Sequence, residues 1–558
     1  MASLVLGPLL RYVGRTDATV WVEVDSPCDV DVLGHQARTF EVRGHHYALV
    51  EMTDLGEGST IPYEVRLDGE VVWPADGAHP PSAIHTRAGE DHARLVFGSC
   101  RVGAPQREPY TLAPSEHGEG HGIDALWAYA RRLMAGIEPW PDALLFCGDQ
   151  VYADEVSPET ARFIRSRRDT SKPPGEEVAD FEEYTRLYRE TWSDPEIRWL
   201  LSTVPSLMIF DDHDVIDDWN ISWQWLKDAR KSDWWHDRIT GAFMSYWIYQ
   251  HLGNLSPSAL AEEEMYRRAV ASDGDVGPEL EAFARQADLE SAAARWAFCR
   301  DFGHSRVLGV DSRAARALGD DRRDLVDTGE WAWIVDRSHE AVDHLVIVST
   351  LPVFMSSGVH YLEAWNEAVC AGAWGRPAAW AAERIRRALD LEHWPAFQTS
   401  FAEMVSLLRD VATGVRGGRP PASVTLVGGD IHNSYVAEVS LGRWDASRGR
   451  VYQLVCSPFR NPLPPLRRRL VRLAGTRLLA SALGELARLA GVRQPTVRWR
   501  YVAGPTFENS IGIMELSGRR AEVTIFGSGS DHERDGLEPL HTRVLAKESP
   551  SGVYERIT

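Results

Sequence analysis

The sequence predicts an α/β fold preceded by a small all-β domain, and two patterns support this. From about residue 5 to 86, apolar and polar residues alternate with a period of two, which is typical of antiparallel strands with one buried face. From about residue 93 onward, short apolar runs alternate with helical segments, as in sheets whose strands are buried on both faces. We therefore expect a β-sandwich domain over 1–88 and an α/β domain over 93–558.

Individual elements can be placed in both domains. Residues 18–24 and 63–73 alternate most clearly, and Asp68-Gly69 supplies the chemistry of a tight hairpin turn. Helices are expected over 123–133 and 181–192, and the second carries Tyr184, Leu187, Tyr188 and Thr191 on one stripe. A helical insertion is expected at about 225–300, a further helical stretch at 374–411, and strands again at 510–516 and 521–526.

Five apolar runs in the second domain each end in residues that bind metals or titrate. In open sheets of this kind, ligands bind beyond the carboxyl ends of the strands. We therefore expect one metal site, assembled from segments that are distant in sequence. The residues that follow the five runs are Gly98-Ser99-Cys100, Cys147-Gly148-Asp149, Asp211-Asp212-His213-Asp214, Ser349-Thr350 and Gly429-Asp430-Ile431-His432.

The segment 211–218 concentrates negative charge directly after a buried strand. It holds five carboxylates within eight residues. Two like charges about 4 Å apart repel by about 4 kcal/mol at an effective dielectric near 20. Such a cluster is either solvated on a surface loop or neutralised by cations. Its position after a buried run favours cations, as does the pair Asp430 and His432, which can share one ion.

Composition excludes several classes of function. The formal net charge of −21 argues against general nucleic-acid binding, which needs a basic face. Only four of the 60 basic residues are lysines, and no Gly-Lys pair of a P-loop occurs. The six cysteines form no C-x-x-C motif, so reduced thiols are expected. We also expect a cytoplasmic protein, since there is no leader-like start and no apolar run long enough to span a membrane.

The strand-ending motifs resemble, in order along the chain, those of the PhoD-like alkaline phosphatase family within the calcineurin-like metallophosphoesterase superfamily. The resemblance covers about residues 94–526 and implies a calcineurin-like β-sandwich flanked by helices, behind a small immunoglobulin- or fibronectin-like domain. The similar motifs are Phe97-Gly98-Ser99-Cys100, Gly148-Asp149-Gln150-Val151-Tyr152, Phe210-Asp211-Asp212-His213-Asp214, Asp311-Ser312-Arg313 and Gly429-Asp430-Ile431-His432.

This resemblance implies a hydrolase of phosphate mono- or diesters that uses iron and calcium. Position by position, Cys100, Asp149, Tyr152 and His432 would surround the iron, and Asp149, Asp212 and Asp430 would face the calcium. The family has asparagines where this chain has Asp217 and Asp218, and a tryptophan in place of Phe210. We count Asp217 among the ligands, and its extra charge could select another divalent metal.

The expected mechanism is attack on phosphorus by a hydroxide that cations make available near neutral pH. His213 is a candidate donor of a proton to the leaving group, and the alternative is a structural or outer-shell histidine. Arg313 is a candidate phosphate clamp, and the alternative is a buried ion pair with Asp311 or another acid.

Rival interpretations remain for the whole chain and for one segment. The chain could be a non-catalytic metal-binding interaction protein with the same fold, or a glycoside hydrolase with paired carboxylates and tryptophan platforms. Residues 466–500 hold nine arginines against one acid, Glu485. We expect a helical flap at about 462–495 docked on the protein itself, and the alternative is a weak contact with an anionic membrane surface. A phosphate ester is the expected partner, and no nucleic-acid surface is expected.

Overall fold

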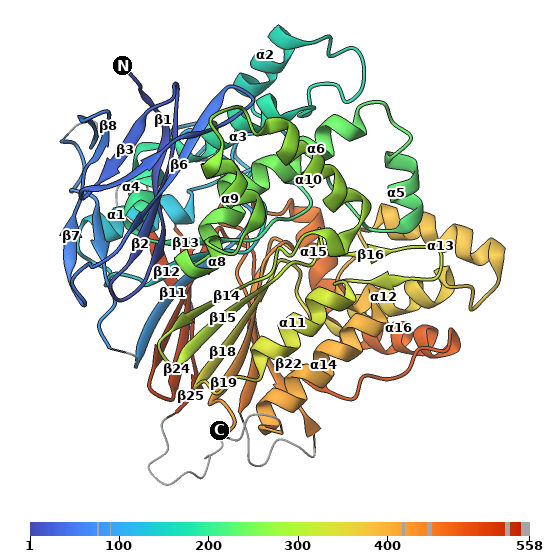
Figure 1. Cartoon of the computed structure of the whole chain (residues 1–558). Coiled ribbons are helices and arrows are strands. Elements are labelled where there is room, and N and C mark those ends of the chain that lie inside the picture. Colours follow the sequence, from blue (N-terminus) through green and yellow to red (C-terminus); the bar gives the residue numbers. More distant parts are fainter. Residues whose placement is uncertain (75–76, 90, 416–418, 443–448, 530–535, 548–558) are drawn as a thin grey trace.

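The computed structural model describes residues 1–547 except 75–76, 90, 416–418, 443–448 and 530–535; the end of the expected second domain, 548–558, lies outside the described residues (Figure 1). An N-terminal β-sandwich, blue in Figure 1, packs beside a larger domain in which two mixed sheets lie between helices. The fold expected from the sequence, α/β after an all-β region, is confirmed.

The N-terminal part contains two four-stranded sheets whose apolar faces enclose one core. The strand predicted at 18–24 is β2, and the Asp68-Gly69 turn joins β8 to β9 with positive φ at both residues. In spatial order the strands are β1 (Leu4–Val13), β2 (Ala18–Val24), β6 (His45–Met52) and β5 (Phe40–Val42), then β4 (His35–Arg38), β3 (Asp29–Val32), β8 (Val65–Leu67) and β9 (Glu70–Trp73), with β7 (Thr60–Pro62) and β10 (Ala83–His85) as a separate pair.

The larger domain is built on a six-stranded and a seven-stranded sheet, which bury a shared apolar layer between them. Phe97 and Leu145 of the first sheet pack in that layer with Val346 and Leu454 of the second. The first sheet runs β13 (Ser206–Met208), β12 (Ala143–Phe146), β11 (His92–Gly98), β23 (Ser510–Ser517), β24 (Arg520–Ser528), β25 (Leu537–Ala546); the second runs β14 (Phe298–Phe302), β15 (Ser305–Val310), β18 (His344–Ser349), β19 (Ser423–Gly428), β21 (Arg450–Val455), β20 (Ser434–Ser440), β22 (Arg498–Thr506).

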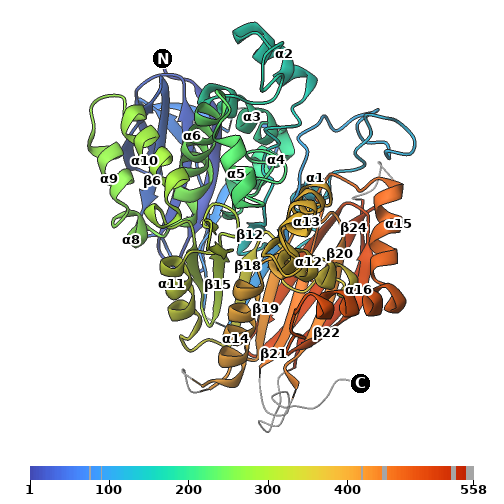
Figure 2. The ribbon, with the colours of Figure 1, turned by 90° about the vertical axis from the view of Figure 1, so that its right-hand side faces the viewer.

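Helices cover the outer faces of both sheets (Figure 2). On the six-stranded sheet packs α1 (Ala125–Met134), and α3 (Phe181–Trp192) and α4 (Pro195–Thr203) belong to the same apolar cluster. On the seven-stranded sheet pack α11 (Thr328–Ser338) and α14 (Gln398–Thr413). The helix predicted at 181–192 is confirmed, and its predicted stripe is buried. The predicted start of α1 moves to Ala125 because the Asp124 side chain caps the helix at Leu126 N and Trp127 N.

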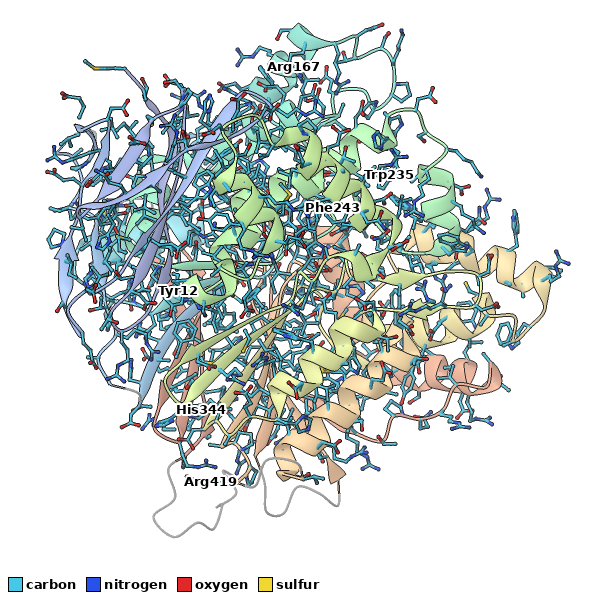
Figure 3. The ribbon with its side chains drawn as sticks, in the orientation of Figure 1. Tyr12, Arg167, Trp235, Phe243, His344 and Arg419 are labelled. Carbon is cyan, nitrogen blue, oxygen red and sulfur yellow. The ribbon has the colours of Figure 1, made fainter. Side chains whose placement is uncertain are left out.

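The predicted helical insertion ties the N-terminal sandwich to the larger domain. Trp21 of β2 packs 5.3 Å from Tyr249, and the Arg11 guanidinium donates to Gln250 O at 2.8 Å. The Arg300 guanidinium carbon lies 3.9 Å from the centre of the Tyr12 ring, and Figure 3 labels Tyr12 between the N-terminal sandwich and the larger domain. The insertion comprises α5 (Trp223–Ala229), α6 (Trp235–Ser245), a π-helical turn (Tyr246–His251), α7 (Leu252–Asn254), α8 (Pro257–Leu260), α9 (Glu264–Ala271) and α10 (Gly277–Leu289); α2 (Pro158–Arg167) precedes it.

The single helical stretch predicted at 374–411 was wrong in its middle. The structure has α12 (Ser357–Cys370), then α13 (Arg376–Ala388) and α14, with a non-α-helical segment at 389–397 between the last two. Asp390 adopts a left-handed backbone there, and Pro395 removes a backbone donor, so an α-helix cannot continue. In the part of the chain that the structure describes, no helix is long and apolar enough to cross a bilayer.

Candidate metal centre

The strand ends meet at one edge of the two sheets. In the six-stranded sheet Gly98 pairs with Phe146 and Phe146 with Met208, so the loops that follow these strands start side by side. The Asp430 loop of the facing sheet reaches the same place, because the Asp430 N–H donates to Ser99 Oγ at 3.2 Å. The Cys100 thiol lies 3.6 Å from the Asp430 carbonyl oxygen. Parallel pairing within one sheet and packing of the second sheet against it therefore bring together residues that are more than 300 positions apart.

Two groups of potential ligands share one carboxylate. Ligand atoms of Cys100, Asp149 and His432 lie within 4.8 Å of one another, and so do those of Asp149, Asp211, Asp212 and Asp430. A third group, at the same spacing, combines Asp212, His213 and Asp217. The sequence predicted all of these except Asp211 as site residues, and the structure brings them into one connected cluster.

Asp149 provides the test of whether cations fit here. Both of its carboxylate oxygens are buried and have no hydrogen-bond partner among the described residues. Burial, together with the charges of Asp212 and Asp430, raises the pKa of Asp149 well above its usual range. An unpaired buried carboxylate is costly, and bound cations would remove that cost. The donor set, with a thiol, an imidazole and several carboxylates, fits one softer and one hard metal ion.

Tyr152 lies at the same centre. Its hydroxyl accepts a hydrogen bond from Asn461 Nδ2 at 3.0 Å, and its ring lies 4.8 Å from that of His213. Burial raises the pKa of the phenol well above 10, and the neighbouring Asp149 and Cys100 raise it further. Only a strong positive charge nearby would allow this phenol to ionise, which is the role expected of a bound metal.

The backbone at the ligand positions is strained. Non-glycine residues rarely adopt positive φ, and such conformations cost on the order of 1–3 kcal/mol each and cluster at functional sites. The sharp turns that end the strands impose them here, and they aim the side chains at a common point. The residues and their φ angles are Cys100 (56°), Asp149 (52°), Asp430 (64°) and His432 (49°).

Gly148 allows the close packing of two of the loops. Its φ is +108°, and a Cβ atom at this position would lie 2.4 Å from Asp211 Oδ2. A glycine before a ligand residue can let a ligand approach the backbone closely. In the structure it is the Asp211 side chain that approaches.

Arg313 is not placed as the phosphate clamp that the sequence suggested, since its side chain is fully buried and surrounded by carboxylates. Its Nε lies 2.6 Å from Asp211 Oδ1, its Nη2 lies 3.0 Å from Asp212 Oδ1, and its Nη1 pairs with Glu392. The alternative interpretation, a buried ion pair, matches this arrangement. The partners are not Asp311, whose Oδ1 instead accepts the Arg313 backbone N–H at 2.8 Å.

His213 lies at the outer side of the cluster. Its Nδ1 is 2.9 Å from Asp154 Oδ2, and its Nε2 is 3.8 Å from Asp217 Oδ1. Burial opposes the charged form of His213, but Asp154 and the carboxylates of Asp149 and Asp212 hold its pKa well above 6.5. Asp217 is at the rim, with 63% of its side chain exposed. An imidazolium oriented in this way can hold a proton beside the cluster.

Sequence reasoning missed several residues that orient the ligands. His393 Nε2 lies 3.2 Å from Asp430 Oδ2, and Glu392 pairs with Arg313. Both belong to the segment that was predicted as continuous helix, which concealed them. Pro395 and the titratable residues before it were the available signal. Asp154 and Asn461, which contact His213 and Tyr152, carried no signal of their own.

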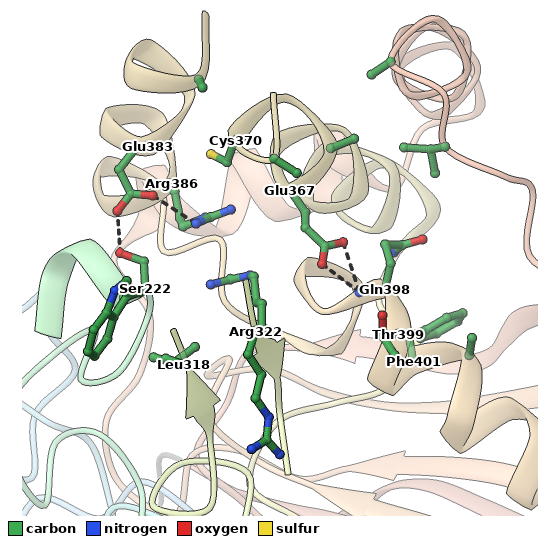
Figure 4. Close-up of a pocket in the computed structure, with 18 of the residues that line it drawn as sticks. Ser222, Leu318, Arg322, Glu367, Cys370, Glu383, Arg386, Gln398, Thr399 and Phe401 are labelled. Atoms are coloured by element: carbon green, nitrogen blue, oxygen red, sulfur yellow. Dashed lines mark hydrogen bonds and ion pairs between the residues drawn. The ribbon is translucent and has the colours of Figure 1, made fainter. Parts of the chain in front are cut away.

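A cavity of about 2100 Å³ lies beside the cluster and not within it (Figure 4). It is walled by α5, α12, α13 and α14, and none of the predicted ligands lines it. Ser222 donates a hydrogen bond to Glu383 at the wall of the cavity, and it lies four residues after Asp218. The insertions thus build a large space next to the candidate metal centre.

The chain has a metallophosphoesterase-like α/β fold, preceded by an N-terminal all-β region. Residues 120–272 match the family model "PhoD-like phosphatase", and residues 1–84 match "Domain of unknown function (DUF7800)". The chain therefore carries a PhoD-like phosphatase domain behind a DUF7800 domain, and the family resemblance inferred from the motifs is confirmed.

Two solved structures are similar to this chain, and the first of them supports the fold. A structure described as that of PhoD superposes with a TM-score of 0.57 at 11% identity, covering 99% of this chain and 94% of that one. Purple acid phosphatase PPD1 from yellow lupin (Lupinus luteus) seeds gives a TM-score of 0.47 at 10% identity, covering 99% and 77%. None of the curated proteins matches the chain significantly.

Proposed function

We propose that the chain is a metal-dependent phosphoesterase that hydrolyses phosphate mono- or diesters. The PhoD-like domain supports the reaction class. The observation that carries the proposal is the convergence of Cys100, His432 and the acidic residues on Asp149, whose two oxygens have no partner among the described residues. A non-catalytic metal-binding role is the rival, and turnover separates the two.

The ligand groups suggest where the metals would bind. Cys100, Asp149, Tyr152 and His432 would hold an iron ion, and Asp149, Asp212 and Asp430 would hold calcium or another divalent ion. Bound cations would supply Lewis acidity, which makes hydroxide available near neutral pH and offsets charge on the phosphoryl oxygens. Burial lowers the pKa of His432 to about 4, so its imidazole is neutral and free to act as a ligand.

The remaining residues would orient and supply protons. His213, held by Asp154, would keep a proton at Nε2 and deliver it to the leaving alkoxide. Arg313 would fix the acidic residues in place by its contacts to Asp211 and Asp212. With Arg313 occupied in this way, charge on the phosphate would be balanced by the cations.

The test combines turnover with metal content. Wild-type protein, purified without added metal, should hydrolyse p-nitrophenyl phosphate or bis-p-nitrophenyl phosphate, and elemental analysis should find a transition metal. Asp149→Asn should lower turnover by at least about 100-fold and lose metal, whereas the exposed Asp29→Asn in β3 should change neither. An Asp149→Asn protein with full turnover would refute the proposal, and metal binding without any turnover would favour the non-catalytic rival.

The identity of the softer metal has its own readout. A phenolate bound to ferric iron absorbs visible light by charge transfer. If Tyr152 ligates iron, purified protein should be coloured, and Tyr152→Phe should lose the visible band while circular dichroism stays unchanged. If the wild-type protein is colourless and contains zinc or manganese, that metal takes the place of iron in this assignment. The rest of the proposed site is not affected.

A further inference from the structure

Helix α15 (Pro465–Ala474) exposes an apolar stripe. No residue of this helix is buried, and Leu466, Leu470 and Leu473 are 68%, 56% and 55% exposed. Their spacing of four and three places them on one face. Leu478, near the start of α16 (Arg477–Leu489), is 87% exposed and follows the stripe in sequence. Soluble proteins rarely expose large contiguous apolar patches, and such patches usually mark an interaction site.

Arginines surround this stripe. Residues 466–500 carry a charge of +8 in a chain of −21, which leaves −29 for the remainder. Arg469 and Arg477 form no ion pair among the described residues, and Arg472 stacks on Phe507 at 5.0 Å. The segment 466–500 is thus net positive in an otherwise acidic protein, and four of its arginines lie on the helix that carries the apolar stripe.

The flap that carries the stripe is firmly attached. α16 docks on α12 with Gly484 facing the Tyr361 ring, and the Tyr361 hydroxyl donates a hydrogen bond to Gln494 at 2.7 Å. The C-terminal end of α15 rests on Gly358, where a Cβ would lie 2.2 Å from the Ala474 carbonyl oxygen. The prediction of a helical flap docked on the protein itself therefore holds for α16. The leucines of α15, which lies at the outer edge in Figure 2, remain exposed.

We propose that α15 and the start of α16 dock on an anionic phospholipid surface. The leucines would enter the boundary between headgroups and acyl chains, while the arginines pair with lipid phosphates, as in interfacial amphipathic helices. The acidic remainder does not oppose this, because its charge is screened beyond about 8 Å at physiological salt.

Docking would bring the candidate metal centre close to the lipid headgroups. α15 begins four residues after Asn461, which donates to the Tyr152 hydroxyl. Four residues span at most about 14 Å. The docking itself does not depend on the proposed phosphoesterase activity, and it is tested by binding alone.

The experiment measures sedimentation of the full chain with vesicles. Protein should co-sediment with vesicles of phosphatidylcholine and phosphatidylserine, and much less with phosphatidylcholine alone or at high salt. The triple variant Leu466→Glu, Leu470→Glu, Leu473→Glu should lose binding by about tenfold or more. Leu289→Glu serves as the matched control, because Leu289 is equally exposed but lies at the end of α10.

A second variant guards against misfolding of the first. Arg469→Glu with Arg477→Glu should also weaken vesicle binding while keeping the wild-type unfolding temperature and turnover. Unchanged binding by both variants would overturn the proposal, as would equal binding of wild type to neutral vesicles. Absence of vesicle binding, together with concentration-dependent dimers that the triple variant abolishes, would assign the surface to a second copy of the chain instead.

Discussion

His393 Nε2 lies 3.2 Å from Asp430 Oδ2, while its Nδ1 lies 2.6 Å from Glu363 Oε1. The imidazole thus links α12 to a central carboxylate of the metal centre. Burial opposes protonation, but the two carboxylates hold the pKa of His393 well above 6.5, so it stays charged. A charged donor of this kind fixes the orientation of Asp430 and keeps it ionised.

Replacing His393 should therefore weaken metal binding. Outer-shell partners of a ligand typically contribute 10–100-fold in metal affinity, and we expect a loss of about that size for His393→Gln. Isothermal titration of metal-free protein with calcium and iron would measure it. The control is His344→Gln. His344 is a buried histidine that contacts Ser423 and Gly518, and it begins strand β18, whereas the metal centre lies beyond the ends of the strands (Figure 3). If both variants kept wild-type affinity, the orienting role would be wrong.

Replacing Arg313 should destabilise the metal-free fold. Arg313→Met would leave Asp211, Asp212 and Glu392 buried without their cation, and losing one partner of a buried ion pair costs about 3–5 kcal/mol. Urea unfolding in the presence of a chelator measures this cost, and added calcium should recover part of it. The exposed pair of Arg15 with Glu57 is the control, since Arg15→Met should cost less than about 1 kcal/mol. If Arg313→Met kept wild-type stability but lost turnover, the interpretation of Arg313 as a phosphate clamp would be favoured instead.

Gly148 should tolerate no side chain. Gly148→Ala combines a positive φ with a Cβ 2.4 Å from Asp211 Oδ2, whereas Gly136→Ala has a positive φ and open space. Gly136→Ala is the control and should lower the free energy of unfolding by about 1 kcal/mol. Gly148→Ala should lower it by more and should also reduce turnover. Denaturant unfolding and hydrolysis of p-nitrophenyl phosphate check both. Equal losses in the two variants would mean that the Asp211 contact carries no weight.

The contact between the N-terminal sandwich and α3 should depend on pH. His45 of β6 lies 3.0 Å from Glu23 and 2.8 Å from Glu182. Burial opposes its charge, but hydrogen bonds to these two carboxylates raise its pKa from 6.5 to about 9. Because the folded pKa is the higher one, the stabilisation is complete below about pH 6.5 and is lost as the pH rises through about 9.

The expected size of this effect is about 3–4 kcal/mol, since the pKa rises from 6.5 to about 9 and one pKa unit corresponds to about 1.4 kcal/mol. Urea unfolding of wild type and His45→Gln should differ by that amount near pH 6 and by much less at pH 10. A difference that is independent of pH would show that His45 contributes by packing only.

Local patterns explain why so much of the fold could be predicted. The strand β2 and the helix α3 have the expected bounds, because period-two and helical stripes are properties of neighbouring residues. The break at 389–397 was missed because the residues around it favour helix, while the stabilising contacts of Glu392 and His393 come from remote segments.

By itself, the sequence determined where each ligand-bearing loop follows its strand, and hence that Cys100, Asp149, Asp430 and His432 belong to one edge of the sheets. Only the tertiary structure decided that Arg313 is enclosed by carboxylates, that His393 holds Asp430, and that α15 leaves its leucines exposed. The reason is physical: strand and turn preferences act between neighbours, whereas burial and ion pairing depend on side chains that only packing brings together.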